Sequence, residues 1–277
     1  MILVDAHVHI YDCFDLEKFF NSAYSNFKNE AVRSDHGRDF IGVLLLAETV
    51  NDNWFHHLSS WADGGSLPGN RNTVDWRFHR TDERCSLHAR SDDNRALFIV
   101  AGRQFVTLEG LEVLSLATTN SFPEGLPIRK LIANVRDTGG TPVIPWGFGK
   151  WMGRRGKTLI KLLDTAKSAD FFLGDNGNRP FFLPHPSQFK LAQDKNIRNL
   201  PGSDPLPFNS GHKKSGSFGF SIFEPLDKSK PWAHIKKMIG SIKTELRSFG
   251  EPIGLFGFFK NQILLQLRKI YGKTNKK

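Results

Sequence analysis

The chain has 277 residues, of which 39% are hydrophobic and two, Cys13 and Cys85, are cysteines. This length suits one large core with a tail, and two cysteines are too few for a disulfide framework. No stretch approaches the ~18 uninterrupted apolar residues of a membrane-spanning helix, and no secretory signal pattern opens the chain. We therefore expect a cytoplasmic protein, with peripheral contact to a membrane surface left open.

The net charge of +10 comes from one end of the chain. Residues 228–277 hold 12 Lys and Arg against Glu245 and Glu251, whereas residues 1–227 hold 26 basic and 26 acidic residues. A protein that binds nucleic acid across its main surface would spread basic residues over that body. We therefore do not expect nucleic acid as a partner.

The first third of the chain alternates apolar strands with helices. A short run rich in β-branched residues at 2–10 predicts a buried strand, and a helix is expected at 16–30. A second apolar strand at 40–47 precedes a predicted helix at 54–62. The Gly- and Asn-rich stretch 63–75 predicts a surface loop.

The middle of the chain is predicted to be mainly β structure, and alternating helices and strands are expected again after it. Four closely spaced strands, expected at 76–82, 86–90, 97–107 and 111–118, predict an antiparallel β insertion at 76–118. Beyond it, helices and strands are again expected in turn, at 126–137, 141–146, 158–168, 171–174, 188–196 and 199–200. That order favours a mostly parallel sheet in a body of residues 1–227.

The tail, residues 228–277, is expected to be a basic helical C-terminal extension. Residues 232–246 and 255–271 carry apolar side chains at helical spacing, with Lys and Arg on the other side. The pattern suits an outer helix packed on the body, and it also suits a helix lying on a membrane surface.

The pair His7 and His9 is the strongest chemical motif. Two residues apart on a strand, both side chains project from one face, which Asp5 shares. Two imidazoles placed in this way can chelate one divalent ion, and burying both without partners would be costly.

Several segments in the same order resemble the polymerase-and-histidinol-phosphatase (PHP) domains and the wider amidohydrolase-like hydrolases. They are 4–10 around the two histidines, 101–107 with 109–114, 139–146, 174–178 around Asn176, and 200–204 with its closing Gly-Ser-Asp. The resemblance implies a distorted TIM-like (β/α) barrel with a metal site at the C-terminal ends of its strands. It also implies metal-dependent hydrolysis of a phosphate ester or related bond.

The chain departs from the PHP pattern at several ligand positions. Glu48-Thr49 stands where the family has Asp-His, Gln104 where it has Glu, and Trp146 where it has His; Pro205-Leu206 follow Asp204 in place of a final His. By resemblance, the remaining ligands are His7, His9, Glu48 and Asp204. They suffice for one ion of Zn, Mn or Fe with an open position for water.

The other site residues are expected to act around that ion. A spare carboxylate of Glu48 or Asp204 would serve as general base, and Gln104 would bind substrate or orient a ligand. The Gly-rich segment 146–157 precedes a helix expected near Thr158, and its cations Lys150, Arg154 and Arg155 suit an anionic group. Trp146 would stack on the substrate and Asn176 would line the pocket.

The sequence thus predicts a metal-dependent hydrolase, phosphoesterase-like, that acts on a small anionic substrate through activated water. The alternative is a catalytically degenerate barrel that binds an anionic ligand or surface. The missing Glu and His ligands favour the alternative, whereas the surviving histidine pair and Gly-Ser-Asp favour the enzyme. The oligomeric state is left open.

Overall fold

The computed structural model describes residues 1–34, 39–64 and 75–274, and most of the predicted surface loop lies outside these ranges. The larger of two sheets has the strand order β11-β10-β1-β2-β5-β4-β3. Its strands are β1 (Ile2–Val8), β2 (Ile41–Leu46), β3 (Trp76–Arg80), β4 (Ser86–Ser91), β5 (Ala96–Val100), β10 (Gly219–Ile222) and β11 (Arg247–Phe249). β1, β2 and β5 run parallel in its centre, which explains their continuous apolar sequences.

The smaller sheet has the order β6-β7-β8-β9. It comprises β6 (Gly102–Val106), β7 (Glu112–Leu116), β8 (Thr141–Pro145) and β9 (Phe172–Gly174). β6, β7 and β8 pair antiparallel, whereas β8 and β9 are parallel. The predicted antiparallel region is therefore divided between the two sheets, with β3 to β5 in the larger one and β6 and β7 in the smaller.

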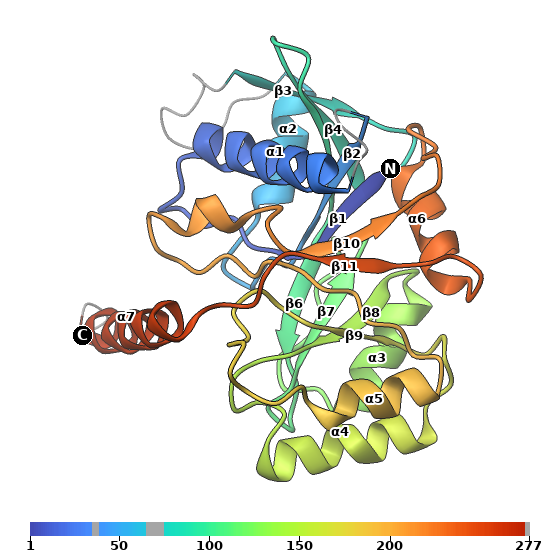
Figure 1. The fold of residues 1–277 in the computed structure, drawn as a ribbon, viewed down its shortest axis with the longest axis vertical. Helices are drawn as coiled ribbons and strands as arrows, with labels where there is room; N and C mark the ends of the chain where they lie inside the picture. The colour runs from blue at the N-terminus through green and yellow to red at the C-terminus, as the bar shows by residue number, and fades with distance from the viewer. Residues whose placement is uncertain (35–38, 65–74, 275–277) are drawn as a thin grey trace.

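Helices cover the outer faces of the two sheets (Figure 1). Helices α1 (Leu16–Arg33) and α2 (Trp54–Ala62) pack on one face of the large sheet. Its other face, together with the small sheet and α6 (Pro231–Gly240), forms a second core. A third core lies between the small sheet and the remaining helices of the body, α3 (Ile128–Asp137), α4 (Gly153–Thr165) and α5 (Ser187–Asp194).

The predicted TIM-like barrel is wrong, because neither sheet closes on itself among the described residues. On one side of β1, the short strand β10 pairs antiparallel, with Val4 opposite Phe220, and β11 follows as the edge. The stretch 97–107, predicted as one strand, also divides at Gly102. A Cβ at Gly102 would lie 2.1 Å from the Leu46 carbonyl oxygen, so the absence of a side chain lets the chain pass from one sheet to the other.

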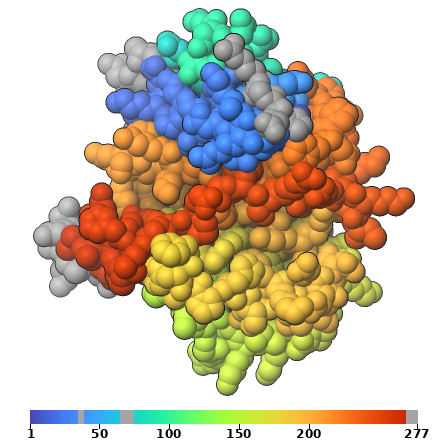
Figure 2. Space-filling view, in the orientation of Figure 1, coloured from blue at the N-terminus to red at the C-terminus, as the bar shows by residue number. Residues whose placement is uncertain are grey.

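Residues 228–277, predicted as an extension, supply elements of the body as well as the tail. Trp232 and Ile235 of α6 are buried in the second core, and β11 belongs to the large sheet. After β11 the chain crosses the front of the molecule and ends in α7 (Leu255–Thr274), the red segment of Figure 2. None of the described helices is both long enough and apolar enough to cross a membrane.

Candidate metal centre

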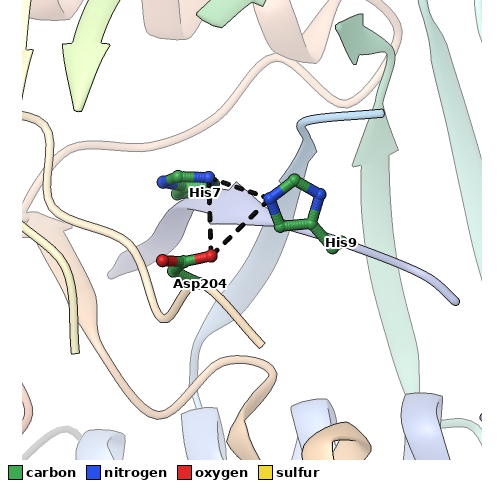
Figure 3. A group of neighbouring side chains, drawn as sticks. All are labelled: His7, His9 and Asp204. Carbon is green, nitrogen blue, oxygen red and sulfur yellow. Dashed lines mark hydrogen bonds and ion pairs between the residues drawn. The ribbon is translucent and has the colours of Figure 1, made fainter. Parts of the chain in front are cut away.

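His7, His9 and Asp204 meet where β1 ends (Figure 3). The Nε2 atoms of the two imidazoles are 3.0 Å apart, and Asp204 Oδ1 lies 3.7 Å from His7 Nε2 and 3.6 Å from His9 Nε2. Both rings are buried, and the Asp204 side chain is 21% exposed. Residues far apart in the sequence thus direct three potential ligand atoms at one point.

The triangle formed by these three atoms has the size that a metal ion requires. With sides of 3.0, 3.6 and 3.7 Å, its circumscribed circle has a radius of about 2.0 Å, which matches zinc–nitrogen and zinc–oxygen bonds of about 2.0–2.2 Å. Two neutral imidazoles and one carboxylate are also ligands typical of zinc, manganese and iron sites. The residues therefore fit a divalent ion.

Burial keeps both imidazoles neutral, which is the form that binds metal. It lowers the pKa of His7 to about 4 and, with the neighbouring His7 as a second cause, that of His9 to about 3. Burial also raises the pKa of Asp204. The Nδ1 atoms of both rings are buried without a hydrogen bond in the described structure, whereas most metal-binding histidines donate from that atom. Packing fixes these rings instead, and His9 stacks on Tyr11 with centroids 5.4 Å apart.

The segment that carries Asp204 lies directly against β1. The Asp204 backbone N–H donates to the His7 carbonyl at 2.8 Å, and Ala6 donates to the Pro201 carbonyl at 3.2 Å. A Cβ at Gly202 would lie 2.1 Å from the His7 backbone nitrogen, so this approach requires glycine. Asp204 itself has a φ of 48°, a left-handed conformation that is strained for any residue with a side chain. Asp204, whose carboxylate faces the histidines, is thus one of four described non-glycine residues with a positive φ.

Two asparagines hold Asp204 from the other side. Asn176 Nδ2 donates to Asp204 Oδ2 at 3.1 Å and to the Trp146 carbonyl at 2.8 Å, and Asn178 Nδ2 donates to the Asp204 carbonyl at 2.7 Å. Asn176 therefore binds the carboxylate oxygen that does not face the histidines. This leaves Oδ1 directed at the common point.

Asp5, expected on the same face as the histidines, instead links β1 to the segment that carries Asp204. Its carboxylate accepts from Ser203 N at 2.8 Å, Ser203 Oγ at 2.5 Å and Gly216 N at 2.8 Å. The register of β1 against β2 shifts between Asp5 and Val8, which interrupts the strict alternation of side chains there. Burial raises the pKa of Asp5 to about 7 against the opposing effect of these hydrogen bonds.

The cluster lies in a cavity of about 270 Å³, which we call the histidine cavity. Four further residues expected from the sequence line it: Gln104, Trp146, Lys150 and Asn176. Gln104 Oε1 lies 3.2 Å from His7 Nε2, and Lys150 forms an ion pair with Glu112. Trp146 directly follows β8, and Asn176 comes two residues after β9, so both lie at the C-terminal ends of these parallel strands. Ligands commonly bind at such strand ends in α/β proteins.

Three of the expected residues do not join the cluster. Glu48 Oε1 accepts the Phe55 backbone N–H at 2.5 Å, in the first turn of α2, where free N–H groups attract a carboxylate. Helix α4 begins at Gly153 rather than near Thr158, so Arg154 and Arg155 belong to its first turn. Arg154 is exposed, and Arg155 donates to the Gly149 carbonyl at 2.9 Å.

Sequence reasoning missed Tyr11, Glu112 and one face of α7, all of which line the histidine cavity. Tyr11 continues the alternation of His7 and His9, and burial raises the pKa of its hydroxyl; that spacing was a usable signal. From α7, the side chains of Phe258, Asn261, Gln262 and Leu265 form part of the wall. No sequence pattern indicates that this helix folds back over the site.

The comparisons with known proteins assign no family. No family model matches the chain, and no curated protein matches it. Among solved structures, the crystal structure of PsfC from Pseudomonas syringae PB-5123 aligns over 98% of each chain, with 14% identity and a TM-score of 0.47. A likeness this distant carries no argument about fold or activity.

Proposed function

We propose that the chain is a metal-dependent hydrolase of the phosphoesterase type, which binds one divalent ion through His7, His9 and Asp204. The observation that carries this proposal is the triangle of ligand atoms, whose size matches a single coordinated cation. The resemblance of several segments to PHP domains supports the same reaction class. We further propose that it works in the cytoplasm.

The charges in the histidine cavity suit an anionic substrate once a cation is bound. Burial favours the neutral form of both imidazoles, and the Lys150–Glu112 ion pair is balanced, which leaves the Asp204 carboxyl as the remaining ionisable ligand. A bound divalent ion with Asp204 as an ionised ligand would leave the site with one positive charge. A phosphate group would then be attracted to the cavity.

The residues around the cation would bind the substrate, accept a proton and orient the ligands. A bound divalent ion would supply Lewis-acid activation of water and of the phosphate ester. Lys150 would hold phosphoryl oxygens, and Glu112, the cavity's second carboxylate, would accept a proton. Gln104 and Asn176 would orient His7 and Asp204 through the contacts described above.

The test compares two double variants that each remove a pair of histidines. His7→Ala/His9→Ala is expected to lose the ion and all hydrolysis of p-nitrophenyl phosphate. His56→Ala/His57→Ala, in the first turn of α2, is expected to keep both. Elemental analysis should find about one ion per wild-type chain, removable by a chelator together with activity. Unchanged metal content and turnover in the His7/His9 variant would end the proposal.

A second candidate function is a binding module for an anionic ligand. The observation that favours it is the small ligand set, because Glu48 caps α2 and so leaves the cluster with three ligand atoms among the described residues. Elemental analysis and the phosphatase assay separate the two functions. A stoichiometric ion, or phosphate binding, without turnover on any phosphomonoester would favour the binding module.

A further inference from the structure

A second cavity of about 410 Å³ adjoins the histidine cavity. We call it the tryptophan cavity, because its wall includes Trp146 and Trp151, both nearly fully buried. The two cavities share Trp146, Gly147 and Phe148 as a common wall. The tryptophan cavity is therefore the space next to a molecule bound at His7 and His9.

The lining of the tryptophan cavity is mostly apolar. Besides the aromatic rings it contains Met152, Leu183 and two prolines. Its polar side chains are already engaged within the protein, as three contacts show. Gln188 Nε2 donates to the Trp151 carbonyl at 3.1 Å, Trp151 Nε1 donates to the Pro145 carbonyl at 3.0 Å, and Arg179 forms an ion pair with Asp175 at 2.8 Å.

Hydrophobic side chains are also exposed beside this cavity. Met152 is 67% exposed and Phe148 is 51% exposed, although both line the cavity. The ring centroids of Phe148 and of Phe258 in α7 are 5.0 Å apart. Phe148 therefore connects the tryptophan cavity with the helical wall of the histidine cavity. Exposed apolar residues around a concave apolar site are typical of a ligand-binding surface.

We infer that the substrate is an amphiphile, a phosphate ester whose hydrocarbon arm occupies the tryptophan cavity while its anionic group binds beside His7, His9 and Asp204. This inference rests on the proposed function for the anionic end. The hydrocarbon end rests on the tryptophan cavity alone. A small, fully polar sugar phosphate would leave that apolar wall exposed to water.

The first experiment measures binding without chemistry. Alkylphosphonates with two, four, six and eight carbons resist hydrolysis, and their dissociation constants for the purified wild-type protein can be measured by calorimetry. Each added methylene that enters an apolar cavity should tighten binding about fourfold, until the cavity is full. Dissociation constants that do not change with chain length would overturn the inference.

A matched pair of variants locates the hydrocarbon arm. Met152→Asp places a charge at an exposed position of the tryptophan cavity, and Met152→Leu keeps it apolar; at 67% exposure neither change threatens folding. The dependence on chain length should be reduced in the aspartate variant and kept in the leucine variant. An equally steep dependence in both would mean that the arm binds elsewhere, which overturns the assignment.

The second experiment separates this inference from the proposed function, using the matching alkyl phosphates as substrates. If kcat/KM rises with chain length, both ideas are supported. If the esters are hydrolysed at rates independent of chain length, the hydrolase stands and the amphiphilic substrate is refuted. If the phosphonates bind with a steep dependence on length but no ester is hydrolysed, the apolar site stands and the phosphoesterase is refuted.

Discussion

Replacing Gly202 by alanine should damage both the fold and the metal centre. The added Cβ would lie 2.1 Å from the His7 nitrogen, whereas ordinary contacts begin near 3.4 Å, so the two segments must separate by about 1.3 Å. This breaks the hydrogen bonds between Asp204 and His7 and between Ala6 and Pro201. Two lost backbone hydrogen bonds at about 1 kcal/mol each, with about 1–3 kcal/mol for overpacking, predict a loss of about 3–5 kcal/mol.

Urea unfolding followed by tryptophan fluorescence measures this loss, and elemental analysis measures metal content in the same samples. Gly240→Ala is the matched control, because a Cβ at Gly240 meets no atom within 4 Å. It should unfold at the same urea concentration as the wild type or slightly higher, since alanine favours a helix. Activity of Gly202→Ala should fall about 100-fold, because an error of about 1 Å in position has that effect. Wild-type stability and metal content in Gly202→Ala would refute the close approach.

Two further predictions concern Glu48 and the outer face of α7. Burial raises the pKa of Glu48 from 4.5 to about 7, so between these pH values the folded state binds more protons than the unfolded state. The unfolding free energy of the wild type should therefore fall relative to Glu48→Gln as pH rises through this window, by up to about 3 kcal/mol in urea titrations; a constant difference would contradict the shift. Phe256 and Phe259 are 84% and 53% exposed on α7, and we expect salt-sensitive co-sedimentation with anionic lipid vesicles. Phe256→Ser/Phe259→Ser should weaken it at least about tenfold, and equal binding to neutral vesicles would contradict the prediction.

Apolar strands and helices could be predicted from the sequence because their hydrophobic patterns are strong. The barrel could not be excluded, because closure depends on which strands pair at the edges. β10 has only four residues and follows a long irregular segment, yet it pairs with β1 and makes the sheet open. Likewise, the division of the predicted strand at Gly102 depends on a contact with the distant residue Leu46. Local propensity contains no information about such contacts.

The residues of the candidate site, like the fold, could be predicted from the sequence only in part. His7 and His9 are two residues apart at the end of one strand, so their proximity follows from local geometry, and Asp204 was indicated by the Gly-Ser-Asp motif. Glu48 could not be assigned from sequence, because the free N–H groups of α2 compete for its carboxylate. Glu112 reaches the cavity only through the pairing of β7 with β6 and β8.

The positions of the three ligand residues along the chain have a consequence for thermal stability. His7 lies in the first strand and His9 directly after it, whereas Asp204 comes after nine of the eleven strands of the described chain. A shared ion would cross-link the first strand to a segment about 200 residues further along the chain, and the unfolded chain would lack that cross-link. An ion present at a hundred times its Kd would add about 2.7 kcal/mol to the unfolding free energy. Melting temperatures measured in a chelating buffer would then be lower than those of the metal-bound protein.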